Sequence, residues 1–147
     1  MREIERKFLV LSLPEGLASH SASEIRQGYL ASEGDREVRV RARDGRFALT
    51  VKLGLGLSRQ EEEVELEESQ FSRLWPLTRG RRVEKKRYVL AHGESRIELD
   101  VFQGALEGLC LAEVEFRSER EAGAFSPPSW FGTEVTDDPR FKNQSLA

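Results

Sequence analysis

The sequence has few of the residues on which disulfide-bonded and thiolate metal proteins depend. Its 147 residues include one cysteine, Cys110, and two histidines. A single cysteine excludes an intramolecular disulfide and a thiolate metal cluster, and it is typical of a reducing compartment. A metal ion bound to this chain would therefore need oxygen ligands.

Long apolar segments and a basic excess are also missing. No stretch approaches the roughly 18 apolar residues of a membrane-spanning helix, and the first ten residues, MREIERKFLV, carry charge where a signal peptide has an apolar core. We therefore expect a cytoplasmic protein that does not bind a membrane. The net charge of −3 predicts no nucleic-acid partner, and the length predicts a single domain over residues 1–147.

Most of the chain alternates apolar and polar residues with a period of two, which is typical of β-strands. The eight predicted strands are 3–10, 24–30, 36–43, 46–53, 59–67, 83–90, 95–102 and 111–117. Asp44-Gly45 predicts a two-residue type I′ hairpin, and His92-Gly93 predicts a second tight turn. Neighbouring strands should therefore pair antiparallel, in a mostly β (α+β) fold.

Three segments depart from this alternation and predict short helices. Residues 69–78 combine a polar start with Phe71 and Trp75, which can cover a sheet, and residues 118–125 form a weaker candidate. Near the end, Asp138 followed by Pro139 is typical of a helix cap and first helical residue.

Nearly every predicted strand carries ionic side chains on one face and apolar side chains on the other. In segment 36–43, Arg39 and Arg41 alternate with Val38 and Val40, and residues two apart share a face of a strand. Segments 46–53 and 83–90 repeat the basic pattern, whereas 3–10, 95–102 and 111–117 are mainly acidic. The two signs are thus segregated by strand.

A face exposed to water would be the plain interpretation of any one such strand. Two like charges about 5 Å apart, however, repel by roughly 3 kcal/mol at an effective dielectric constant of about 20. Clustering Arg39, Arg41 and Lys52 is therefore unfavourable unless an anion lies among them. Clustered carboxylates bind hard divalent cations, so the two faces together predict a metal-chelated phosphate chain as ligand.

The motif Glu3-Ile4-Glu5-Arg6-Lys7 resembles the ExExK signature of the CYTH superfamily, the triphosphate tunnel metalloenzymes. The resemblance continues in order along the chain through Val38-Arg39-Val40-Arg41, Thr50-Val51-Lys52, Arg59-Gln60-Glu61-Glu62-Glu63, Lys85-Lys86-Arg87-Tyr88, Glu98-Leu99-Asp100, Glu113-Val114-Glu115 and Val135-Thr136-Asp137-Asp138. It implies a closed eight-stranded antiparallel β-barrel with an ionic tunnel inside, a few helices packed outside and a C-terminal helix.

The resemblance also implies roles for individual residues. Metal coordination, by Mg²⁺ or Mn²⁺, is implied for Glu3, Glu5, Asp100, Glu113 and Glu115. Phosphate binding is implied for Arg39, Arg41, Lys52, Lys85, Arg87 and Lys142. Lys7 matches a residue proposed to activate the attacking water, with an ordinary ion pair to Glu5 as its alternative. Tyr29 is a second catalytic candidate, with plain packing as its alternative.

Several enzyme functions share this resemblance. The short chain leaves little room for a base-recognising subdomain, so we expect hydrolysis of inorganic tripolyphosphate to pyrophosphate and phosphate, and a triphosphate-containing small molecule as partner. The alternatives are a nucleoside or thiamine triphosphatase, a class IV adenylate cyclase, or a non-catalytic polyphosphate-binding module. Glu61 and Glu63 can bind metal, or they can form salt bridges with the arginines of the tunnel. The apolar outer faces leave a homodimer possible.

Overall fold

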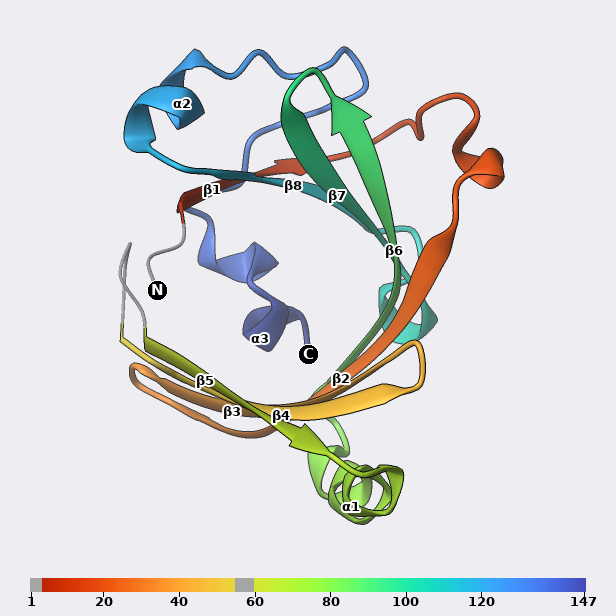
Figure 1. Cartoon of the computed structure of the whole chain (residues 1–147), viewed down its shortest axis with the longest axis vertical. Coiled ribbons are helices and arrows are strands. Elements are labelled where there is room, and N and C mark those ends of the chain that lie inside the picture. The colour runs from red at the N-terminus through yellow and green to blue at the C-terminus, as the bar shows by residue number, and fades with distance from the viewer. Residues whose placement is uncertain (1–3, 55–59) are drawn as a thin grey trace. The chain divides into compact units, whose positions relative to one another are not determined.

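The computed structural model describes residues 4–54 and 60–147, so the predictions made for Glu3 and Arg59 lie outside the described residues. Eight strands form one sheet in the order β1-β8-β7-β6-β2-β3-β4-β5 (Figure 1). Their bounds are β1 (Ile4–Leu9), β2 (Ala22–Glu33), β3 (Arg36–Arg43), β4 (Arg46–Leu53), β5 (Gln60–Leu66), β6 (Arg82–His92), β7 (Ser95–Phe102) and β8 (Cys110–Phe116).

This sheet confirms the predicted mostly β fold and the number of strands. The closed barrel is not confirmed, because the strand order of the described residues has β1 and β5 at its two ends and does not join them. The predicted hairpin between β3 and β4 is confirmed. Asp44 and Gly45 both have positive φ, at 49° and 79°, and a type I′ turn requires this at its two central residues.

Two compact units divide the chain. The first contains Glu24–Lys85 and Pro139–Ala147, and the second contains residues 4–23 and Lys86–Asp138. Strand β6 contributes its first residues to the first unit and the remainder to the second. The single domain expected from the length stays a prediction.

In the first unit, helix α1 (Glu68–Leu74) covers the apolar face of β3 and β4. Phe71 of α1 is buried against Val40 and Ala42, and Trp75 of the following 3₁₀ turn (Trp75–Thr78) stacks on the Phe71 ring at 5.3 Å. The short C-terminal helix α3 (Asn143–Leu146) lies on the other side of these strands in Figure 1. One face of this sheet therefore packs apolar residues, and the opposite face carries the ionic ones.

In the second unit, the apolar core lies on one face of β1, β7 and β8. Its fully buried members include Leu99, Ala112 and Val114. Helix α2 (Glu119–Ala124) and the segment after it add the aromatic rings Phe125, Trp130 and Phe131, which pack against this cluster. These aromatic rings and the partly buried Cys110 therefore have packing roles.

Part of the apolar outer surface of the first unit is exposed. Val51, Leu53 and Val64 of β4 and β5 have exposed fractions of 39%, 36% and 57%, but the homodimer suggested by such surfaces stays a prediction. Among the described residues, the helices are too short or too polar to cross a membrane.

Candidate functional site

The strand register of the first unit lines up the predicted phosphate-binding residues in cross-strand rows. Arg39 of β3 pairs with Tyr29 of β2 and with Thr50 of β4, and Arg41 pairs with Gln27. Because cross-strand partners project to the same side of a sheet, these side chains share the face opposite α1. We call this the arginine face, defined by Gln27, Tyr29, Glu37, Arg39, Arg41, Thr50, Lys52 and Lys85.

Arg39 lies at the centre of the arginine face and is 7% exposed. Its Nη1 lies 3.6 Å from Oε1 of Glu37, which is also buried, and Tyr29 is its cross-strand neighbour in β2. The Nε of Arg39 is buried and has no hydrogen-bond partner among the described residues. A buried donor without a partner is costly, so this N–H fits an anionic ligand that completes the site.

Tyr29 is buried beside Arg39, with an exposed fraction of 1%. Burial raises the pKa of Tyr29 above its ordinary value of 10.0, and the charge of Glu37 raises it further, against opposing effects of Arg39 and Gln27. The Tyr29 hydroxyl is therefore neutral and protonated at physiological pH. A neutral phenol can donate a hydrogen bond to a phosphate oxygen.

Gln27 connects Arg41 to Tyr29 across the arginine face. Its Oε1 accepts hydrogen bonds from Nε of Arg41, at 2.8 Å, and from Nη2. Its Nε2 donates to Oη of Tyr29 at 2.6 Å. The amide thus holds Arg41, a predicted phosphate-binding residue, and Tyr29, a predicted catalytic residue. The sequence assigned Gln27 no role, because a neutral side chain adds nothing to the charge pattern.

Lys52 and Thr50 extend the arginine face toward β5. Nζ of Lys52 lies 4.0 Å from Oε2 of Glu61, and Thr50 Oγ1 donates to Oε1 of Glu63 at 3.5 Å. Glu61 therefore forms an ion pair, as one of its two predicted roles requires, but its partner is Lys52 and not an arginine. Glu63 instead accepts from a hydroxyl.

Lys85 is the most deeply buried cation of the arginine face, with an exposed fraction of 0%. Its Nζ donates to Oδ1 of Asn143 in α3 at 3.3 Å. The predicted basic contact from the C-terminal segment, Lys142, is exposed and directly precedes α3. From the C-terminal segment, the neighbouring Asn143 therefore contacts Lys85, and no charge pattern indicated this residue. The substrate role of Lys142 stays a prediction.

The second unit carries a carboxylate face, defined by Glu5, Glu98, Asp100, Glu113 and Glu115, with Lys7 and Arg87 among them. Glu5 pairs with Glu115 in the β1–β8 register, and Lys7 pairs with Glu113. Nζ of Lys7 lies 2.9 Å from Oε1 of Glu113, so Lys7 forms an ion pair with Glu113. Two carboxylates directly opposite each other repel, which makes the Glu5–Glu115 pair suitable for a shared cation.

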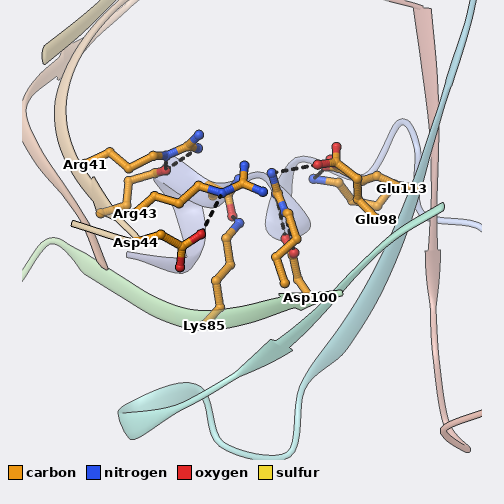
Figure 2. A network of polar contacts seen from close by, with 11 residues as sticks. Arg41, Arg43, Asp44, Lys85, Glu98, Asp100 and Glu113 are labelled. Carbon is orange, nitrogen blue, oxygen red and sulfur yellow. Dashed lines mark hydrogen bonds and ion pairs between the residues drawn. The ribbon is translucent and has the colours of Figure 1, made fainter. Parts of the chain in front are cut away.

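Asp100, which Figure 2 labels, accepts two buried hydrogen bonds from Arg87. Nε of Arg87 donates to Oδ1 of Asp100 at 2.7 Å, and Nη2 of Arg87 donates to Oδ2 at 3.0 Å. Nη1 of Arg87 lies 3.0 Å from Oε2 of Glu98. Burial alone would lower the pKa of Arg87, but the hydrogen bonds and charge of Asp100 outweigh burial and raise it. Arg87 is therefore a permanent cation with a fixed orientation.

The predicted metal ligands are only partly described. Residues 4–54 and 60–147 contain no group of three Asp, Glu, His or Cys side chains close enough to hold a metal ion, and Glu3 lies outside these residues. Oxygen donors that face each other, such as Glu5 and Glu115, suit a hard divalent cation. Both oxygens of Asp100 accept hydrogen bonds from Arg87, so its metal role stays a prediction.

Comparisons with known proteins agree with this arrangement. A family model described as the CYTH domain matches residues 1–136. The chain is 51% identical over 149 residues to the inorganic triphosphatase of Nitrosomonas europaea, with 100% of this chain and 97% of that protein covered. It is 37% identical to the inorganic triphosphatase of Acetivibrio thermocellus, with 99% and 92% covered.

A solved structure is similar over the same length. The crystal structure of an inorganic triphosphatase matches with a TM-score of 0.80 and 48% sequence identity, and the match covers 99% of this chain and 93% of that one. The resemblance carried by the ExExK motif and the later motifs is thereby confirmed. The chain belongs to the CYTH domain family.

Proposed function

We propose that this protein is an inorganic triphosphatase, which hydrolyses tripolyphosphate to pyrophosphate and phosphate with the help of Mg²⁺ or Mn²⁺. The observation that carries the proposal is the buried Nε of Arg39, which has no hydrogen-bond partner within residues 4–54 and 60–147, on a face that gathers arginine and lysine side chains. Relatives over the full length named inorganic triphosphatase support the same substrate.

The arginine face binds the phosphate chain in this proposal. Arg39 and Arg41 donate pairs of hydrogen bonds to nonbridging phosphate oxygens. The ammonium groups of Lys52 and Lys85 add positive charge beside the phosphate chain. Phosphoryl transfer depends mainly on positioning and on charge neutralisation. Side chains that are already buried and held by Gln27, Glu37 and Asn143 lose little conformational freedom when the substrate binds.

The carboxylate face holds the divalent cation in this proposal. Glu5 and Glu115, with Glu113 and the undescribed Glu3, would supply its oxygen ligands. When bound, such an ion neutralises phosphate charge and polarises the phosphoryl group. Arg87, fixed by Asp100, contributes a further cation for the substrate.

Two residues carry the proton chemistry in this proposal. Lys7, as the neutral amine, accepts a proton from the attacking water, and Glu113, 2.9 Å from its Nζ, stabilises the ammonium that forms. The neutral Tyr29 hydroxyl donates a hydrogen bond to a phosphate oxygen. The closed barrel implied by the family remains part of this proposal.

A non-catalytic phosphate-binding module is the second candidate. The arginine face alone supports this candidate, because a protein that only binds a polyanion needs basic side chains and no cluster of carboxylates. The carboxylate face, with Glu5 directly opposite Glu115, favours the enzyme.

Product analysis of purified protein tests the proposal. The protein is incubated with tripolyphosphate, ATP or thiamine triphosphate, with Mg²⁺, with Mn²⁺ or with EDTA, and products are followed by phosphorus NMR. We expect equal amounts of phosphate and pyrophosphate from tripolyphosphate, only with metal and faster than from the other substrates. Cyclic AMP from ATP, or no preference for tripolyphosphate, would refute it.

Two variants separate the enzyme from the binding module. Lys7→Ala and Glu5→Gln should lose turnover of tripolyphosphate while calorimetry still detects its binding. Glu62→Gln in β5 removes one exposed carboxylate, lies outside both defined faces, and should retain full turnover. An inactive wild type that binds tripolyphosphate tightly would favour the module.

A further inference from the structure

Gln27 is a buried amide between two groups that the proposed function places on the substrate. It lies on β2 with an exposed fraction of 0%, directly opposite Arg41 in the register and two residues before Tyr29. A polar side chain this deeply buried is expected to have partners. Its partners here are Arg41 and Tyr29.

The chemistry of these partners fixes the orientation of the amide. A guanidinium has only donors, so the oxygen of Gln27 must face Arg41, where it accepts from Nε and Nη2. The Nε2 group then faces Tyr29 and donates to its Oη at 2.6 Å. Because this hydroxyl oxygen accepts from Gln27, its own proton points away from Gln27.

The same contacts determine how Arg41 can bind a ligand. With Nε and Nη2 both directed at one oxygen, the guanidinium plane cannot rotate without losing two hydrogen bonds at once. The neutral amide oxygen of Gln27 fixes the guanidinium plane without adding a negative charge beside the phosphate-binding cations. A glutamate of the same shape would add that charge and would lack the N–H that Tyr29 accepts.

We propose that Gln27 is a positioning residue, which orients the Arg41 guanidinium and the Tyr29 hydroxyl toward the phosphate oxygens of the substrate. This inference rests on the proposed function, because it assumes that Arg41 and Tyr29 contact substrate. Gln27 itself acts through them and need not touch the substrate.

Two substitutions at this position separate its hydrogen bonds from its volume and charge. Gln27→Met keeps a similar volume but removes all three hydrogen bonds. Gln27→Glu keeps the acceptor for Arg41, removes the donor to Tyr29 and adds a charge. Gln103→Glu, at an exposed position, is the matched control for the added charge.

Steady-state kinetics with tripolyphosphate and Mg²⁺ provide the first readout. We expect Gln27→Met to raise KM about tenfold, the scale of one hydrogen bond to a charged group, with a smaller fall in kcat. Gln27→Glu should raise KM further, and Gln103→Glu should match the wild type. Kinetics of Gln27→Met within twofold of the wild type would overturn the inference.

A double-mutant cycle with Arg41→Lys distinguishes positioning from general structural support. Lysine keeps a cation but lacks the two N–H groups that Gln27 accepts from. In this background Gln27→Met removes only the hydrogen bond to Tyr29, so it should raise KM by clearly less than in the wild-type background. An equal tenfold effect in both backgrounds would show that Gln27 does not act through Arg41 and would overturn the inference.

The two proposals fail in different ways. An inactive wild type would refute the triphosphatase but would leave tripolyphosphate binding measurable by calorimetry, where the same variants should raise Kd by the same factors. An active wild type with unaffected Gln27 variants would refute only the role of Gln27. Wild-type protein with neither turnover nor binding would refute both.

Discussion

Gly28→Ala should disturb the arginine face although residue 28 points to the opposite side of β2. A Cβ on Gly28 would lie 2.5 Å from Oγ1, 2.6 Å from Cβ and 2.8 Å from Cγ2 of Thr78, well inside the contact distance of about 3.5 Å between carbon atoms. Gly28 is flanked by Gln27 and Tyr29, so a shift of β2 would move both of these side chains.

The cost follows from how firmly Thr78 is held. Its hydroxyl donates to the Trp75 carbonyl at 2.7 Å and accepts from Nε of Arg82 at 2.9 Å, and the residue is fully buried. Moving it would break hydrogen bonds worth about 1 kcal/mol each, and overpacking costs about 1–3 kcal/mol. We expect a loss of about 3 kcal/mol, or roughly 6–12 °C in Tm for a chain of this size.

Thermal and urea unfolding followed by circular dichroism measure this loss, and tripolyphosphate kinetics should show a raised KM. Gly123→Ala in α2 is the matched control, because a Cβ there would have no atom within 4 Å. Alanine in a helix is favoured over glycine by about 0.5–1 kcal/mol, so the control should be as stable as the wild type or more stable. If Gly28→Ala unfolds within about 0.5 kcal/mol of the wild type, the packing argument is wrong.

Three further predictions concern buried and titrating groups. Asp100→Asn should cost about 2 kcal/mol in urea unfolding, because Arg87 loses its charged partner but keeps Glu98; an unchanged urea midpoint would contradict this. Hydrogen bonding from Arg6 lowers the pKa of Glu134 below its ordinary 4.5, so Glu134→Gln should lose at most about 1 kcal/mol at pH 7. That difference should shrink as the pH falls through the lowered pKa, and a pH-independent difference would refute it. The pKa of Tyr29 is raised above 10.0, so its contribution to stability is complete below pH 10 and is lost above it. Tyr29→Phe should therefore flatten the alkaline loss of stability, and an identical alkaline profile would argue against it.

The sequence predicted most of the fold because its turns are marked. Strands β3, β4 and β7 have the predicted bounds, and Asp44-Gly45 forms the expected turn. Strand β2 continues to Glu33, beyond the predicted end at residue 30. A register shift between Tyr29 and Ala31 interrupts the two-residue alternation there, so the pattern ended before the strand did.

Helix starts were harder to predict where the cap is an unusual residue. Helix α1 begins at Glu68 because Glu67 and Gln70 form a capping box, whereas the sequence pattern favoured Ser69. At the C-terminus, the predicted start at Pro139 is confirmed, but it opens a 3₁₀ turn, Pro139–Phe141, before the short helix α3.

The candidate site was predictable only as far as it is charged. Arg39, Arg41 and Lys52 were found because their repetition with a period of two is improbable without an anion. Gln27 and Asn143 were missed, since a neutral amide follows no charge pattern and its role depends on contacts across strands or from the chain end. The sequence therefore indicated that the ligand is a polyanion, but it did not indicate the neutral side chains that hold the phosphate-binding residues in place.

The central claim is that the arginine face binds a triphosphate, and calorimetric titration with tripolyphosphate in EDTA tests it most directly. We expect one binding site per chain, and a Kd raised at least tenfold in Arg39→Met, whereas Arg73→Met on the exposed side of α1 should leave Kd unchanged. Absence of binding to the wild type, or the same Kd for wild type and Arg39→Met, would contradict the claim.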